Sequence, residues 1–297
     1  MKLNSIYCRL LPLMSSLILC MVSCQGISFE EDEDESESRG SMEMKIRLTG
    51  LSPSSPDVYK PVATQGESRA TSKDTDSPEH LLLAIYTKKG NLVDKIMIQD
   101  KSSAEEFGTF KKELEFGTYT ILAIGWRGSQ ECIVGDGESI PSSLDSVSFS
   151  ERWVPNSYIC RQNIIVSDSY SDTRTLSLKR CVTKFLLMFA EDKVPDNIHD
   201  CVIEAKGIGW RMAQTSHYCK PEATYTRVIS VNPTNTGITF YAFMPKEESE
   251  ADIVITARDV DGNTLAKQTY ENVPLKINRC TEFSEHFFTG TSENYIY

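Results

Sequence analysis

The residues of this chain that could take part in acid–base or nucleophilic chemistry are scattered. Its four histidines, His80, His199, His217 and His286, form neither an HExxH nor an HxH pair that could bind a catalytic metal. The sequence also lacks a GxSxG motif, a phosphate-binding glycine loop and a nucleophilic cysteine with an evident base. These absences predict a protein that is not an enzyme and that uses no metal and no other cofactor.

Two groups of residues nevertheless allow a binding function. Asp259, Asp261 and Asn263 could offer oxygens to calcium, but Asp-Gly-Asn between two alternating apolar runs is typical of a tight hairpin turn, which we favour. Three tryptophans could form a sugar-binding platform near the ends of expected strands, although packing at the core or its rim is their commoner use. They are Trp126, Trp153 and Trp210.

The N-terminus carries a clearer chemical signal. Residues 10–22 are apolar apart from two serines, and they are too few to cross a hydrocarbon core of about 30 Å, which takes about 20 residues. Lys2 and Arg9 precede this run and the small Ser23 follows it. A basic start, a short apolar core and a small residue before a cleavage point predict a signal peptide over residues 1–23.

The stretch Met21-Val22-Ser23-Cys24 resembles the bacterial lipobox, in which the cysteine becomes the new N-terminus and carries acyl chains such as palmitate. Met21 departs from the leucine that is commoner there, and Cys20 is disfavoured because the bulky Leu19 precedes it. An ordinary secretory signal that happens to contain a cysteine is the alternative. We expect lipidation at Cys24, because several acyl chains together hold a protein on a membrane almost permanently.

An acidic tether follows over residues 24–41. Between Glu30 and Glu37 seven of eight positions are carboxylates, a block that stays extended and solvated. It could be a simple spacer, but an acidic run just after a lipidated cysteine resembles the surface-export signal of Bacteroidales lipoproteins. We therefore expect a lipid-anchored protein exposed on the cell outer membrane.

Charge and cysteine content agree with export. Losing Lys2 and Arg9 with the signal changes the net charge from −11 to −13, which argues against nucleic acid as a partner. Six cysteines at large, irregular spacings do not suggest zinc, and in an oxidising compartment they could form up to three disulfides; buried free thiols are the alternative. They are Cys132, Cys160, Cys181, Cys201, Cys219 and Cys280.

The sequence pattern after residue 41 predicts that strands position any functional site. In the first, Met42, Met44, Ile46 and Leu48 alternate with polar residues, which predicts a strand with one buried face. Residues 52–78 read as a loop, and further short strands follow at regular spacing, with no sustained helical period. We expect an all-β protein with two β-sandwich domains, over residues 42–170 and 171–297.

The chain resembles the Bacteroidales fimbrillin-like proteins. The resemblance lies in "MEMKIRLTG", the stretch from "ESRAT" to "KKGNLV", "GTYTILAIGW", "LKRCVTKFLLMF" and "NVPLKINRCTEFSEHFF", which occur in family order. With the lipobox and the acidic tether, the similarity is to minor fimbrial subunits, including anchor subunits. The six cysteines depart from the family pattern.

The resemblance implies two transthyretin-like β-sandwiches in tandem and assembly with other fimbrial subunits. In polymerising relatives an Arg-specific protease removes the first strand and a neighbour's C-terminal strand replaces it by strand addition. Here the removable strand would be Met42–Leu48, with Arg69 or Arg39 as the candidate cleavage site; either arginine could instead be simply solvated. An anchor must keep its lipid, so we expect it to keep this strand and to donate its C-terminal segment instead. The strand-exchange candidates there are Tyr295, Ile296 and Tyr297; a frayed terminus is the alternative for this segment.

The sequence therefore predicts a fimbrial subunit, most of all an anchor or accessory subunit. The alternative is a surface lipoprotein that binds a glycan or a host ligand through loops of the sandwiches.

Overall fold

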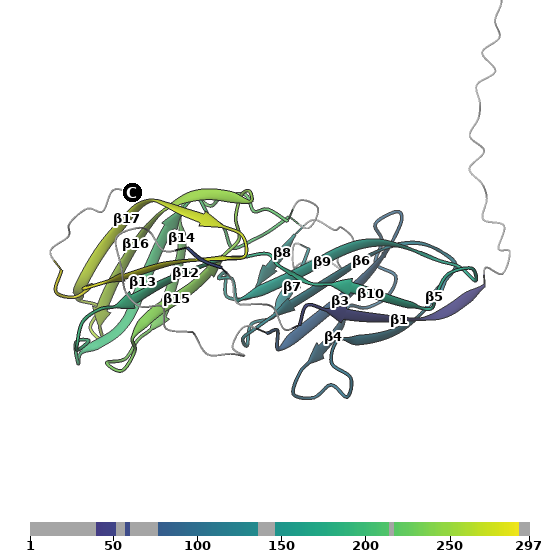
Figure 1. Ribbon diagram of the computed structural model, residues 1–297, viewed down its shortest axis with the longest axis horizontal. Coiled ribbons are helices and arrows are strands. Elements are labelled where there is room, and N and C mark those ends of the chain that lie inside the picture. The colour runs from purple at the N-terminus through teal and green to yellow at the C-terminus, as the bar shows by residue number, and fades with distance from the viewer. Residues whose placement is uncertain (1–39, 52–56, 60–76, 136–145, 214–216, 291–297) are drawn as a thin grey trace, which may run out of the picture. The chain divides into compact units, whose positions relative to one another are not determined.

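The computed structural model of the protein describes residues 40–51, 57–59, 77–135, 146–213 and 217–290. Over these residues the chain forms strands, turns and bends and no helix, which confirms the all-β class (Figure 1). The part of the chain that the structure describes accordingly contains no helix with the length and hydropathy of a membrane span.

The N-terminal half forms two sheets that pack face to face. The three-stranded sheet has the order β10 (Thr173–Ser177), β1 (Ser41–Thr49) and β5 (Thr109–Glu115). The five-stranded sheet has the order β11 (Lys179–Arg180), β9 (Ser157–Val166), β6 (Gly117–Trp126), β3 (His80–Thr87) and β4 (Met97–Asp100). Apolar side chains from both sheets, such as Ile46 and Ile121, share one buried cluster. Because successive side chains of a strand point to opposite faces, each of the two sheets turns one face toward this core.

The C-terminal half is a second sandwich of two four-stranded sheets. The first has the order β15 (Gly237–Ala242), β12 (Thr183–Phe189), β18 (Arg279–Glu285) and β2 (Asp57–Tyr59). The second has the order β14 (Tyr225–Ser230), β13 (Ile198–Lys206), β16 (Glu248–Asp259) and β17 (Thr264–Lys276). Its core is rich in aromatic rings: Phe185 stacks on Phe283, with ring centroids 5.3 Å apart, and contacts Tyr270 edge to face.

A third apolar cluster joins the two halves. It contains the outer face of β3 and β6, the small hairpin of β7 (Cys132–Val134) and β8 (Val147–Phe149), and residues of the C-terminal half such as Met212 and Phe243. Because β3 and β6 are covered on both faces, they are continuous apolar runs instead of alternating ones. Residues Arg39–Tyr297 accordingly form one compact unit.

Two expected elements differ from the structure. The stretch Thr175–Phe189, which includes the family-like "LKRCVTKFLLMF", does not form one strand but is divided among β10, β11 and β12, of which the first two pair with N-terminal strands. Strand pairing would therefore place a boundary between two sandwiches after Arg180 and not at residue 170, and the division into domains stays a proposal. The expected loop over residues 52–78 also contributes β2, which pairs with β18.

Candidate functional site

The first strand, β1, is built as the alternation predicts. Met44 and Ile46 are completely buried and Leu48 nearly so, while Met42 packs half-buried at the end of the same cluster. The intervening side chains face outward. A segment with this pattern must place its apolar side chains in a row of sites along the opposite sheet.

Strand β1 lies in the middle of its sheet, between β5 and β10 (Figure 1). It pairs antiparallel with β5 and parallel with β10, so both of its edges are satisfied. The backbone N–H of Lys45 donates to the carbonyl of Asp172 at 2.7 Å, and that of Leu48 to the carbonyl of Gly108 at 2.7 Å. Loss of β1 would thus expose three apolar sites and two unpaired strand edges at once.

Polar contacts hold both ends of β1. Ser41 Oγ donates to Glu113 Oε1 at 2.7 Å, and Thr49 Oγ1 donates to the Leu176 carbonyl at 3.3 Å, a contact between residues 127 positions apart. Lys45 Nζ lies 3.5 Å from Glu106 Oε1. A hydrogen bond from Thr109, and then the charge of Lys45, lower the pKa of the Glu106 carboxyl.

The chain that follows β1 leads to the second sandwich. Strand β2 pairs in parallel with β18, and Val58 lies opposite Cys280. The sequence pattern missed β2 because three residues within a Ser- and Pro-rich stretch show no measurable period. Both β1 and β2 precede Arg69, so one cleavage after this arginine would separate both strands from the rest of the chain.

Several predicted site residues lie outside the described part of the chain. They are Cys24, Arg39, Arg69, Tyr295, Ile296 and Tyr297. Of the strand-exchange candidates, the structure therefore describes Met42, Met44, Ile46 and Leu48, and it brings all four onto one face of β1.

In the structure no disulfide joins any two of the six cysteines, all of which lie in the described residues, so the alternative of buried thiols fits better than cross-links. Cys181 and Cys219 are buried in the third cluster, where their thiols donate to the carbonyls of Ser157 and Phe243 at 3.4 and 3.2 Å. Burial raises the pKa of the Cys181 thiol, and likewise those of Cys201 and Cys219, to about 12. These cysteines fill apolar positions as small hydrophobic side chains.

The tryptophans are mostly used in packing. Trp126 is 3% exposed, stacks on His80 with ring centroids 5.1 Å apart, and donates from Nε1 to the Gln130 carbonyl at 2.8 Å. A sugar platform at Trp126 is therefore wrong. The guanidinium of Arg227 lies 4.0 Å from the ring centroid of Trp153.

Trp210 also has charged neighbours. The guanidinium of Arg152 lies 5.6 Å from its ring centroid and that of Arg211 lies 5.0 Å away. Arginine over an aromatic face is a favourable contact that a sugar would have to displace. Packing, as the commoner use of tryptophan, thus describes these rings better than ligand binding does.

The turn predicted at Asp259 is confirmed. Its Oδ1 accepts from the backbone N–H of Asp261 at 3.0 Å and of Asn263 at 2.8 Å, and its Oδ2 accepts from Asn263 Nδ2 at 3.0 Å. Gly262 adopts a φ of 83°, as a tight hairpin requires. Among the residues that the structure describes, no group of three or more His, Cys, Asp or Glu side chains could hold a metal ion.

The fold was compared with those of solved protein structures. A candidate adhesin from Bacteroides ovatus is 12% identical, with a TM-score of 0.51 over 84% of this chain and 90% of that one. A second candidate adhesin from the same species is 13% identical, with a TM-score of 0.49 over 79% and 84%. The fimbrial anchor protein Mfa2 from Porphyromonas gingivalis is 11% identical, with a TM-score of 0.40 over 77% and 82%. At 12% identity, the match to the first of these adhesins shows that the fold is similar and shows nothing about function.

A comparison with curated protein sequences gave no significant match. The family described as fimbrillin-A associated anchor proteins Mfa1 and Mfa2 matches residues 66–282, which begin after β1 and β2 and include almost all of both sandwiches. Because this match spans more than half of the chain, the protein belongs to the family of fimbrillin-A associated anchor proteins Mfa1 and Mfa2.

Proposed function

We propose that the protein is the anchor or an accessory subunit of a fimbrium, joined to a neighbouring fimbrial subunit by β-strand addition. Family membership supports a fimbrial role. The observation that supports strand addition is the position of β1, which pairs along both edges and buries Met44, Ile46 and Leu48 against the opposite sheet. In the anchor this site is already filled by the chain's own strand.

Lipid attachment at Cys24 would hold this subunit on the surface of the outer membrane, with the acidic tether as a spacer. Cleavage after Arg69 would separate the lipid, β1 and β2 from the sandwiches, whereas cleavage after Arg39 would release the lipid and leave both strands. Either cut would end anchoring. The protein therefore works uncut and offers its own C-terminal segment, with Tyr295, Ile296 and Tyr297, to its partner.

The test of the anchor compares two cysteine substitutions in a Bacteroidales host. Mass spectrometry of the wild-type protein should find an acylated Cys24 at the N-terminus and β1 still attached. Cys24→Ala should release the protein and its fimbriae into the medium, while the matched control Cys20→Ala should leave both on the cells. A native chain with an unmodified N-terminus, free in the medium, would end this proposal.

The test of the donor segment is a cross-linking experiment on whole fimbriae. Replacing Tyr295, Ile296 and Tyr297 together by serine should abolish the cross-link to the neighbouring subunit. The control changes the polar residues of the same segment, Ser292→Ala with Glu293→Gln, and should keep the cross-link. Equal cross-linking by both variants would show that the segment is not the donor.

The alternative function, binding of a glycan or host ligand through sandwich loops, has less support. Trp126 is buried, and arginines lie over the rings of Trp153 and Trp210. Saturable sugar binding lost in Trp210→Ala would favour this alternative over the fimbrial one.

A further inference from the structure

A cavity of about 430 Å³ opens beside the paired ends of β9 and β11. Its lining comes from both halves of the chain: β9 and β11 contribute Arg161, Lys179 and Arg180, and the C-terminal half contributes His217 and Glu247. Cavities of this size take small molecules. Neither the strand-addition site nor the tryptophans belong to it.

The strand register explains why positive charge gathers there. Lys179 lies opposite Ile159 in the β9–β11 pair, and Arg161 follows Ile159 by two residues. Cross-strand partners share a face of the sheet, and so do residues two apart in one strand. Lys179 and Arg161 therefore share one face beside the cavity.

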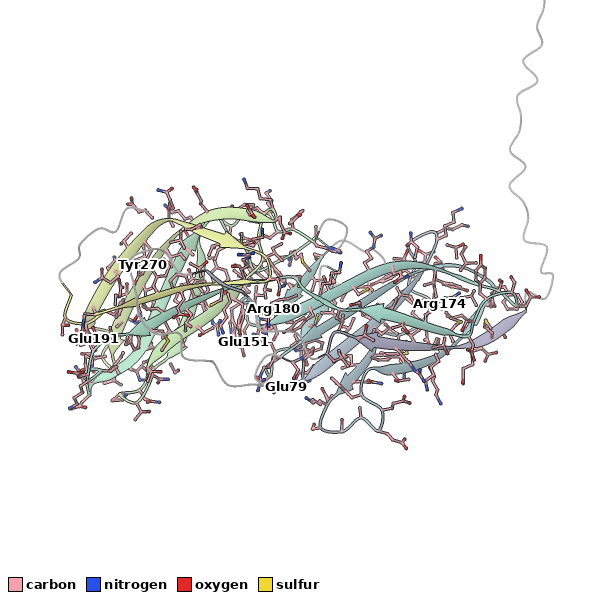
Figure 2. The ribbon with its side chains drawn as sticks, viewed as in Figure 1. Glu79, Glu151, Arg174, Arg180, Glu191 and Tyr270 are labelled. Carbon is pink, nitrogen blue, oxygen red and sulfur yellow. The ribbon has the colours of Figure 1, made fainter. Side chains whose placement is uncertain are left out.

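Arg180, which Figure 2 labels, also belongs to the lining, and several contacts hold its side chain. It is 6% exposed; its Nε donates to Asn156 Oδ1 at 3.0 Å and one Nη donates to the hydroxyl of Tyr158 at 2.8 Å. Its guanidinium also lies 5.3 Å from the Tyr158 ring centroid. Because successive side chains of a strand point to opposite faces, this guanidinium supports the Tyr158 side of the strand pair, and Lys179 and Arg161 remain the cations on the other face.

His217 completes the cavity from the loop before β14. Its backbone N–H donates to the Ala213 carbonyl at 2.9 Å, and its φ of 61° is left-handed, a conformation that the surrounding structure must hold in place. Burial, and then the charges of Arg161 and Lys179, lower the pKa of the imidazole. Arg161 and Lys179 therefore both lie close enough to the His217 imidazole to influence its charge.

Two nitrogens at the cavity are buried without a hydrogen-bond partner among the described residues: Nε of Arg161 and Nε2 of His217. Buried polar atoms are nearly always satisfied, so such a pair in one cavity indicates missing hydrogen-bond partners, and the partner of the Arg161 Nε must be an acceptor because a guanidinium only donates. Glu247 is the only acid of the lining, which lies wholly in the described part, and it is exposed. In a chain with a net charge of −11, this local excess of positive charge needs an explanation.

We propose that this cavity binds an oxyanion, a carboxylate or a phosphate group, carried by a small polar molecule. Arginine presents donors that match the two oxygens of either group, and a charge-assisted hydrogen bond is about twice as strong as a neutral one. Gln162 and Ser177 in the lining would bind the neutral hydroxyls of the ligand. This binding is independent of fimbrial assembly.

Calorimetric titration of the full chain tests the proposal with three probes of one size: glucuronate, glucose 6-phosphate and uncharged glucose. Saturable binding of either charged sugar, with none for glucose, supports it, and the sugar that binds tells whether the oxyanion is a carboxylate or a phosphate. Added salt should weaken this binding. Equal binding of glucose, or no binding of any probe up to about 10 mM, overturns the proposal.

Charge-removing variants localise the binding. Arg161→Gln and Lys179→Gln should each weaken it at least tenfold with an unchanged thermal midpoint. Lys193→Gln is the matched control, because it removes the same charge from an exposed ion pair outside the cavity, and it should bind as the wild type does. If Arg161→Gln fails to fold, the exposed Lys179→Gln decides. An equal loss in Lys179→Gln and Lys193→Gln overturns the proposal, because net charge would then explain the binding.

Discussion

Ile46 in β1 lies directly opposite Phe110 in β5, and both side chains are buried in the N-terminal core. This pair joins the first strand of the chain to a strand that follows more than sixty residues later. The burial of apolar side chains therefore contributes most of the specific stabilisation of β1 in its sheet. Its backbone hydrogen bonds are less specific, because any other strand in the same register could make them.

Truncation of Ile46 should measure how much the buried face of β1 contributes to the free energy of unfolding. Ile46→Ala removes a fully buried side chain, and the free energy of unfolding should fall by about 2–5 kcal/mol. Arg47→Ala, the exposed next residue of β1, should change it by less than about 0.5 kcal/mol. Urea denaturation of both variants checks this, and an equal loss would mean that β1 is not held by its buried face.

Cleavage should uncover the site of β1. Treating the purified protein with an Arg-specific protease should raise the fluorescence of a hydrophobic dye, because β1 and β2 both precede Arg69. Arg69→Gln should remain dark under the same treatment, since a cut at Arg39 keeps both strands on the chain. A rise in the Arg69→Gln variant would contradict the assignment of this arginine.

The ion pair of Asp200 and Arg258 should contribute more to stability than exposed ion pairs do. Arg258 donates to the nearly buried carboxylate twice, from Nε and from one Nη, both at 2.8 Å. Asp200→Asn leaves the guanidinium without its charge partner and should lower stability by about 1–3 kcal/mol. Lys193→Gln breaks the exposed pair with Asp196 and should cost less than about 0.5 kcal/mol.

Glu285 should make stability depend on pH. Burial, and then the neighbouring carboxylate of Glu191, raise the pKa of its carboxyl, although a hydrogen bond from the Tyr270 hydroxyl opposes this. A raised pKa means that the native state binds the proton of Glu285 more tightly than the unfolded state does. The contribution of the protonated carboxyl to stability is therefore complete below the pKa of the unfolded chain, about 4.5, and is lost as the pH rises through the higher pKa of the native state.

Glu285→Gln should therefore raise the thermal midpoint at pH 7 and leave it nearly unchanged at pH 4, because the neutral amide does not ionise. Glu271→Gln, an exposed position on β17, serves as the control and should have little effect at either pH. A midpoint for Glu285→Gln that falls at pH 7 would show that the hydrogen bond to Tyr270 outweighs the burial.

Without disulfides among the described residues, stability should not depend on a reductant. Because no disulfide joins the six described cysteines, dithiothreitol should leave the midpoint of urea unfolding unchanged. A loss of about 2–4 kcal/mol on reduction would instead reveal a disulfide.

Local patterns in the sequence were sufficient for several features. The alternation from Met42 to Leu48 predicts β1 and its buried face, and Asp-Gly-Asn predicts the hairpin between β16 and β17. Both signals are local, since the side-chain period of a strand and the φ of a turn glycine depend on adjacent residues. The all-β class follows from many such signals together.

Other features depend on residues that are far apart in the sequence. Nothing within Asp57–Tyr59 specifies β18 as its partner, and nothing around Lys179 specifies that it will share a cavity with His217. The cysteines likewise show by their count that pairs are possible, but only the fold decides whether two of them are brought together. The sequence by itself determined the all-β class, the buried face of β1 and one turn. Tertiary structure alone decided which edges meet and which charges converge, because these follow from the packing of whole sheets and not from any neighbouring residue.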